Sequence, residues 1–195
     1  MSNLPGIIII IVLVLSFFLH YESNYSDLIY AKSTVDNKNY LVRNRDDRVE
    51  AANMLSLIKT NLIKIVEHLK ENNMSDPRVK RLVSKFQPSN ISESLPNTNY
   101  TSYSVNKGEK IVFCIRAKDE KESLEDINTM MFVAIHELAH IMTSSVGHTD
   151  EFWDNMKYLL EKGIKIGVYS QEDYKSKPRE YCGVKITDSP LEYKK

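Results

Sequence analysis

The sequence predicts an α+β domain that has a small antiparallel sheet and two successive helices and follows an N-terminal apolar helix. Three observations predict this class. An uncharged apolar run opens the chain, two strand-like segments in the middle are separated by a turn sequence, and apolar residues recur at helical spacing in the second half. The 195 residues suit one compact domain with a sizeable core.

The first segment, residues 1–21, is interpreted as a transmembrane signal anchor that contacts the membrane through residues 4–21. Its apolar run, Leu4–Leu19, carries no charge and would extend about 24 Å as a helix, slightly short of a hydrocarbon core of about 30 Å. A cleaved signal peptide and a buried helix are the alternatives, but no Ala-x-Ala-like site follows. We therefore expect a single-pass membrane protein, or a secreted one if the segment is cleaved. Its orientation stays open because no Lys or Arg precedes the run.

The next segment, residues 22–45, is polar and weakly patterned. We expect a tether that includes one short strand, Tyr40–Arg43. The folded domain is then expected to comprise residues 46–195.

Two helices are expected at the start of this domain. Asp46 or Asp47 is placed to cap a long helix that reaches about Asn72, since apolar residues recur there at helical spacing. A short helix over residues 79–86 and a loop over residues 89–97 should follow.

A β-hairpin is expected in the middle of the chain. Its strands are Tyr100–Val105 and Lys110–Arg116, and Asn106–Gly108 forms the turn.

The next helix carries His136, Glu137 and His140 in the pattern His-Glu-x-x-His. On a helix the two histidines lie one turn apart on one face, so both imidazoles can reach one metal ion. Glu137 lies about 100° around the helix from His136, where it can touch a water molecule without ligating the metal. An apolar stripe supports the helix on the opposite side and consists of Ile127, Met131, Ala134, Leu138 and Met142.

A third metal ligand is expected from His148, which follows His140 after a short connector. Thr149 is placed to cap a second amphipathic helix directly after it, ending at Gly163. Three protein ligands plus water are typical of a catalytic Zn²⁺. Glu151 and Glu161 on the second helix remain alternative third ligands.

The pattern His136-Glu-x-x-His140, followed by Gly-His148-x-x-x-Phe-Trp153, resembles the small zinc metallopeptidases of the SprT-like and WLM groups, also called minigluzincins. The resemblance covers roughly residues 98–190. The metzincin pattern fits poorly, because Thr143 stands where that pattern needs glycine.

The resemblance implies a zincin-like fold with one Zn²⁺ held by His136, His140 and His148, and Glu137 as the general base. In these families a strand crosses near the active-site helix and offers its edge to the backbone of a protein or peptide substrate. Main-chain hydrogen bonds hold a peptide there without demanding a sequence.

The net charge and the cysteine content limit the kinds of site that the chain can have. The net charge is zero and no basic block is present, so no clear nucleic-acid site is expected. The chain has two cysteines, Cys114 and Cys182, which exclude a disulfide framework or a Cys-based zinc site and allow one bridge in an oxidising compartment.

Tyr169, Tyr174 and Tyr181 are candidates to stabilise an oxyanion. The sequence does not choose among them and favours ordinary packed or exposed tyrosines.

The sequence therefore predicts a membrane-tethered zinc endopeptidase in which Glu137 takes a proton from water and passes it to the leaving amine. Two alternatives remain. One is a protease for DNA–protein crosslinks, as some members of the resembled families are. The other is a structural protein of a membrane or virion that retains a metalloprotease fold, and the intact Glu137 counts against it.

Overall fold

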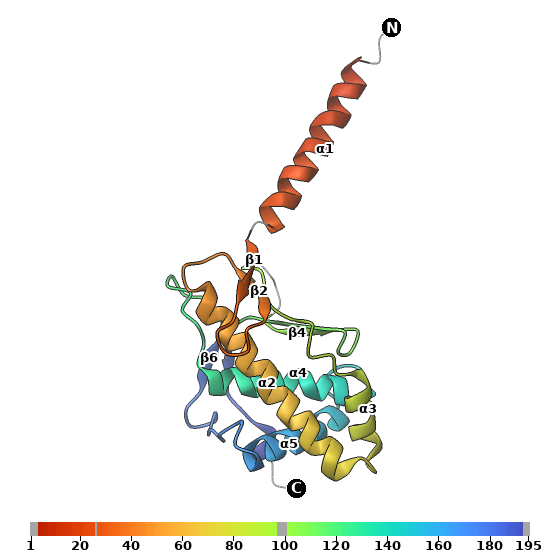
Figure 1. Cartoon of the computed structure of the whole chain (residues 1–195), viewed down its shortest axis with the longest axis vertical. Coiled ribbons are helices and arrows are strands. Elements are labelled where there is room, and N and C mark those ends of the chain that lie inside the picture. Colours follow the sequence, from red (N-terminus) through yellow and green to blue (C-terminus); the bar gives the residue numbers. More distant parts are fainter. Residues whose placement is uncertain (1–3, 26, 97–100, 193–195) are drawn as a thin grey trace.

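The computed structural model describes residues 4–25, 27–96 and 101–192 of the chain (Figure 1). In chain order its elements are α1 (Leu4–Tyr25), β1 (Leu28–Lys32), β2 (Asn39–Arg43), α2 (Arg48–Asn73), α3 (Pro77–Lys85), β3 (Ile91–Glu93), β4 (Tyr103–Val105), β5 (Lys110–Phe113), α4 (Ile127–Met142), α5 (Asp150–Lys165), β6 (Arg179–Tyr181), β7 (Val184–Ile186) and a 3-10 turn at Pro190–Glu192. The α+β class is confirmed.

Local signals place the helices within a residue or two of the predicted bounds. Asp47 stands at the N-cap position of α2, but its carboxylate binds Arg116 and accepts no capping hydrogen bond. Asp76 caps α3 by accepting a hydrogen bond from the backbone N–H of Arg78, and Pro77 fits the first turn because that position needs no donor. The end of α5 differs from the prediction, because the helix continues past Gly163 to Lys165. Gly163 serves packing instead: a Cβ there would meet Ile135 at 3.2 Å.

The main sheet has the strand order β1-β2-β3-β5-β4. The outer pairs β1–β2 and β4–β5 are antiparallel, whereas β3 runs parallel to both β2 and β5. The prediction of a purely antiparallel sheet is therefore wrong. The reason is β3, a strand within the expected loop 89–97, which enters the sheet after the long crossover through α2 and α3.

Further strands lie outside the central hairpin. β1 lies in the segment 22–45 that was predicted to be a tether, and it pairs along its whole length with β2. Near the C-terminus a second hairpin, β6–β7, turns at Cys182 and Gly183. The hairpin β4–β5 is confirmed, although Tyr100 lies outside the described residues.

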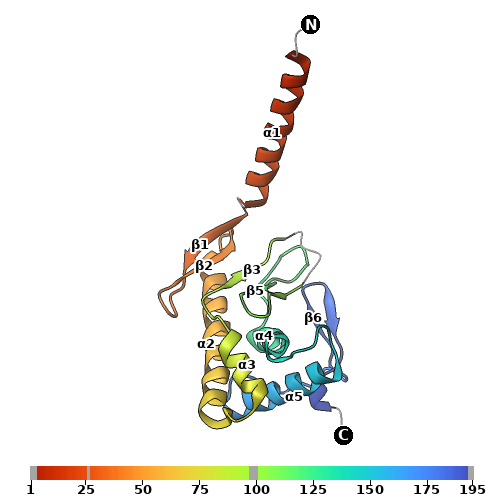
Figure 2. The same cartoon turned by 90° about the vertical axis from the view of Figure 1, so that its right-hand side faces the viewer.

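The core lies around α4. Figure 2 looks nearly along this helix, which is enclosed by α2, α3, α5 and the strands. α2 buries a full row of apolar side chains against it, and all of them are inaccessible to solvent: Leu55, Ile58, Leu62, Ile65 and Leu69. Because α4 is covered on most sides, most of its residues are buried, and the site can open only along the remaining face.

The expected membrane anchor is wrong. α1 extends away from the rest of the chain (Figure 1), and its apolar side chains from Ile7 to Leu19 are at least half exposed. In the part of the chain that the structure describes, however, no helix combines the length and the apolar character that a membrane crossing requires. The physical reason is length: the run Leu4–Leu19 extends about 24 Å, and polar residues such as Glu22 and Asn24 form the remainder of α1.

Candidate active site

The helix α4 begins at a strong cap. The carboxylate of Asp126 accepts hydrogen bonds from the backbone N–H groups of Asn128 and Thr129. From that start, helical periodicity places His136 and His140 on the half-exposed face, while Glu137 is 4% exposed. The two imidazoles therefore point out of the core on the open face of the helix.

His148 reaches the same place from the loop between α4 and α5. Gly147 adopts φ +84°, a left-handed conformation that favours glycine, and directs the chain back toward α4. Thr149 then caps α5 by accepting a hydrogen bond from the backbone N–H of Phe152. His148 is exposed and stands immediately before this cap.

The three imidazoles form a close triangle. The Nε2 atoms of His136 and His140 lie 3.2 Å apart, those of His136 and His148 3.1 Å, and those of His140 and His148 3.2 Å. In the part of the chain that the structure describes, this is the one group of potential metal ligands. Nitrogen ligands about 2.0–2.1 Å from a tetrahedral zinc ion stand about 3.3 Å apart, so the triangle fits such an ion.

Hydrogen bonding alone does not satisfy this triangle. A neutral imidazole Nε2 either donates or accepts, and three such atoms in mutual contact must include two of the same kind. At least one pair would then oppose donor to donor or lone pair to lone pair at about 3 Å. A cation that receives all three lone pairs removes the conflict.

The surroundings also keep His136 and His140 neutral. Burial lowers the pKa of His136 to about 3, and the nearby His140 and His148 add to the effect. Burial likewise lowers the pKa of His140 to about 4, with His148 and Lys107 contributing repulsion. Neutral imidazoles are the form that binds metals.

One aromatic ring packs against all three imidazoles. The ring of Phe152, fully buried in the first turn of α5, lies 4.8 Å from the ring of His136, 4.4 Å from that of His140 and 4.6 Å from that of His148. Trp153 packs against His148 with ring centroids 5.5 Å apart. The sequence alone did not predict that Phe152 contacts these imidazoles. The signal that could have identified it was its place in the pattern His-x-x-x-Phe-Trp.

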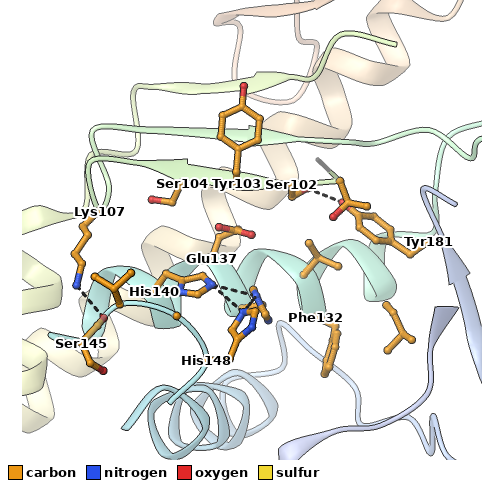
Figure 3. Close-up of a pocket in the computed structure, with 16 residues that line it drawn as sticks. Ser102, Tyr103, Ser104, Lys107, Phe132, Glu137, His140, Ser145, His148 and Tyr181 are labelled. Carbon is orange, nitrogen blue, oxygen red and sulfur yellow. Dashed lines mark hydrogen bonds between the residues drawn. The ribbon is translucent and has the colours of Figure 1, made fainter. Parts of the chain in front are cut away.

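Glu137 lies on the other side of the histidines, between α4 and β4 (Figure 3). Burial raises the pKa of its carboxyl group to about 7, and the nearby backbone of Ser104 opposes part of that rise. A carboxyl group that exchanges its proton near neutral pH suits general acid–base chemistry.

A cleft of about 510 Å³ opens over these residues. Its two ends differ in chemistry (Figure 3). One end is lined by the apolar and aromatic side chains of Phe132, Val133, Tyr181 and Ile186. The other end is lined by Lys107 and by the loop that precedes His148.

The chain resembles known proteins over most of its length. The WLM domain model matches residues 38–194. The chain belongs to the WLM family. The resemblance inferred from the zinc motif is thereby confirmed, and family membership supports a metal-dependent protease of the WLM type that acts on proteins.

Relatives of this WLM chain occur in viruses. An uncharacterised protein of Acanthamoeba polyphaga mimivirus is 32% identical over 188 residues, which cover 94% of each chain. An uncharacterised protein of invertebrate iridescent virus 3 is 31% identical over 129 residues, or 64% of this chain and 79% of the relative. The crystal structure of Wss1 from Saccharomyces cerevisiae superposes with a TM-score of 0.50 at 19% identity, covering 65% of this chain and 86% of that chain, and shows the shared fold.

The two glutamates considered as alternative third ligands lie elsewhere in the WLM domain. Glu151 binds Ser144 and Ser145 of the loop before His148. Glu161 is exposed, and neither glutamate joins the histidine group.

Of the three candidate tyrosines, Tyr181 lines the cleft, whereas Tyr169 and Tyr174 pack with Phe132 in the core. The hydroxyl of Tyr181 donates to the carbonyl oxygen of Cys114 and contacts the Ser102 hydroxyl at 2.6 Å. Its one proton is therefore already engaged, and the structure gives no support to an oxyanion role.

A disulfide secures the apolar end of the cleft. Cys114, just after β5, is bonded to Cys182 in the turn of the β6–β7 hairpin. The hairpin carries Tyr181 and Ile186, so the disulfide attaches this wall of the cleft to the main sheet.

Proposed function

We propose that the chain is a zinc-dependent endopeptidase, with His136, His140 and His148 as the zinc ligands and Glu137 as the general base. The observation that carries this proposal is the triangle of Nε2 atoms, 3.1–3.2 Å on each side, with Glu137 next to it. A zinc ion held there would polarise the scissile carbonyl group and lower the pKa of a water molecule.

Glu137 moves the protons. Its carboxylate accepts a proton from the attacking water and delivers that proton to the nitrogen of the leaving amine, so water is added across the peptide bond. The pKa near 7 suits both transfers.

The edge strand β4 is suited to binding an extended peptide. The carbonyl oxygen of Thr101 accepts a hydrogen bond from the backbone N–H of Cys114. The backbone N–H and C=O groups of the odd-numbered residues in this segment therefore face β5. Ser102 and Ser104 alternate with them, and their backbone groups face the free edge above the cleft. The hydroxyl of Ser104 is buried and has no partner among the described residues, a cost that a bound peptide could remove.

The direction of the peptide follows from antiparallel pairing with β4. β4 runs from the apolar end of the cleft toward the turn that carries Lys107. A peptide bound antiparallel begins at the Lys107 end, so the residues after its scissile bond lie over Phe132 and Ile186. The substrate we propose is an extended or unfolded protein with an apolar side chain on the C-terminal side of the cleaved bond.

The test uses the full chain, measured zinc content and three kinds of substrate: a peptide library, an unfolded protein, and a protein crosslinked to DNA. We expect one zinc per chain and cleavage of the peptides and the unfolded protein. Cleavage restricted to the crosslinked protein would favour the crosslink-protease alternative. Full zinc occupancy with no cleavage of any substrate would favour a structural role.

A further inference from the structure

The loop Thr143–Gly147 carries the chain from His140 to His148, and apolar packing does little to hold it. Val146 is 87% exposed, and Gly147 and His148 are also exposed. A metal ligand must nevertheless be held within a few tenths of an ångström of its productive position. The restraint on this loop must therefore come from polar contacts.

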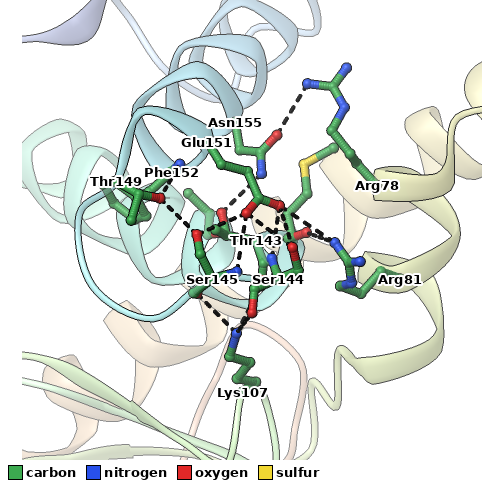
Figure 4. Close-up of polar contacts among 12 residues, drawn as sticks. Arg78, Arg81, Lys107, Thr143, Ser144, Ser145, Thr149, Glu151, Phe152 and Asn155 are labelled. Carbon is green, nitrogen blue, oxygen red and sulfur yellow. Dashed lines mark hydrogen bonds and ion pairs between the residues drawn. The ribbon is translucent and has the colours of Figure 1, made fainter.

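Lys107 supplies the first set of contacts, from the turn between β4 and β5. Its ammonium group donates to three consecutive carbonyl oxygens: that of Thr143 at 3.0 Å, that of Ser144 at 2.6 Å and that of Ser145 at 3.1 Å (Figure 4). An ammonium group has three donors, and all three are used here. The same carbonyls follow the C-terminus of α4, where a cation is favoured by the helix dipole.

Glu151 supplies the second set, from the first turn of α5. Its carboxylate accepts from the backbone N–H of Ser144 at 2.9 Å and of Ser145 at 3.1 Å, and from both serine hydroxyls at 2.8 Å. The backbone amides of Ser144 and Ser145 thus bind the Glu151 carboxylate, and the backbone carbonyls of the same loop bind the Lys107 ammonium group. Charged partners make the stronger hydrogen bonds.

A further layer fixes the start of the loop. Thr143 donates to the carbonyl oxygen of Ala139 at 2.7 Å and accepts from the side-chain amide of Asn155 at 2.9 Å. Arg78 in turn donates to Asn155 at 3.1 Å, and Arg81 donates to the carbonyl oxygen of Met142 at 3.1 Å. The end of α4 is therefore rigidly placed, and Lys107 and Glu151 extend that order toward His148 (Figure 4).

We propose that Lys107 and Glu151 are positioning residues that hold His148 in the metal-binding triangle, and that Lys107 also fixes the edge strand relative to it. This inference rests on the proposed function. Glu151 joins the loop to α5 and, through an ion pair at 3.7 Å, to Arg81 of α3, whereas Lys107 joins the loop to the β4–β5 hairpin. Loss of Glu151 should therefore weaken zinc binding, and loss of Lys107 should weaken both zinc binding and peptide binding.

The experiment compares Glu151→Gln and Lys107→Met with matched controls that change the same residue types at exposed positions, Glu161→Gln on α5 and Lys110→Met on β5. Zinc dissociation constants are measured by competition with a chelator, and KM and kcat are measured at saturating zinc. We expect zinc affinity to fall ~10- to 100-fold in both test variants. KM should rise in Lys107→Met only, and the controls should match the wild type.

Variants that retain part of the contact separate positioning from folding. Lys107→Arg keeps the charge and several donors, so its zinc affinity should lie nearer the wild type than that of Lys107→Met. If a charge variant does not fold, Ser145→Ala takes its place. It removes one hydroxyl partner of Glu151, and its zinc affinity then tests whether contacts to the loop position His148. Circular dichroism of the zinc-free proteins identifies any such variant.

The outcomes are distinguishable. A wild type that binds no zinc removes the proposed function together with this inference. A wild type that binds zinc, with Glu151→Gln and Lys107→Met binding it equally well, overturns the positioning role and leaves the proposed function standing. An equal rise of KM in both test variants would overturn the separate role of Lys107.

Discussion

The carboxyl group of Glu137 lies next to Ser104, and both residues line the cleft (Figure 3). One residue lies on the edge strand and the other on α4, so this contact joins the proposed substrate-binding strand to the proposed base. Burial raises the pKa of Glu137 to about 7, and the nearby backbone of Ser104 limits that rise by favouring the ionised form.

Glu137→Gln should lower the rate of peptide cleavage ~10²- to 10⁴-fold, because the amide cannot accept the proton of the attacking water. Zinc content should not change, since Glu137 is outside the histidine triangle. The measurement is kcat/KM at matched zinc occupancy. Glu125→Gln is the control, because burial also raises the pKa of Glu125, which accepts from Cys182 away from the cleft. Equal rates for Glu137→Gln and the wild type would remove Glu137 from the mechanism.

His148→Ala should weaken zinc binding strongly, because only two histidine ligands remain. The loss should exceed the ~10- to 100-fold that is typical when a residue supporting a ligand is removed. Isothermal titration with zinc measures the change. Glu161→Ala is the matched control and should bind zinc like the wild type. If His148→Ala kept full affinity while Glu151→Ala or Glu161→Ala lost it, a glutamate would be the third ligand.

Ile186→Glu should change which peptides are cleaved. Ile186 lines the apolar end of the cleft, and a carboxylate there would disfavour an apolar side chain after the scissile bond. We expect kcat/KM for peptides with leucine or phenylalanine at that position to fall about 10-fold or more. Val184→Glu is the control, since Val184 lies on the same strand and is exposed. A shift in preference before the scissile bond would contradict the antiparallel direction.

Loss of the disulfide should lower the free energy of unfolding by ~4 kcal/mol, because the bond closes a long loop in the unfolded chain, with a separation of 68 residues. Cys182→Ser and reduced wild type should therefore unfold at similar denaturant concentrations. Denaturant titrations with and without reductant check this. Reductant should leave Cys182→Ser unaffected, and a wild type that is equally insensitive would show that the bond does not form.

Acid should remove the stability that Asp36 contributes. Burial raises the pKa of its carboxyl, but hydrogen bonds from Tyr40 at 2.6 Å and from Lys59 at 2.9 Å outweigh burial and hold the pKa well below 3.8. The folded state therefore favours the ionised form, so this stability is present above pH 3.8 and is lost as the pH falls further.

Asp36→Asn tests this pH dependence. The wild type should be more stable than the variant at pH 7, and the difference should shrink below pH 4 in denaturant titrations of the zinc-free protein. Asp46→Asn, at an exposed position, should follow the wild type throughout. A difference that stays constant down to pH 2 would contradict the prediction.

The sequence by itself determined the features that depend on neighbouring residues. Helical periodicity places His136 and His140 on one face of α4, and the turn Asn106–Gly108 closes the β4–β5 hairpin. Thr149 caps α5 as predicted. These features could be predicted from the sequence because each depends on a few neighbouring residues of the chain.

The tertiary structure decided everything that depends on residues far apart in the chain. It placed β3 between β2 and β5, brought Lys107 and Glu151 to the loop before His148, and covered Glu137 with Ser104. No local pattern specifies these contacts, because a short strand, a surface lysine and a helix glutamate look the same in sequence wherever they pack. Their partners are set by how the whole chain closes around α4, and that closure depends on the summed burial of many distant side chains.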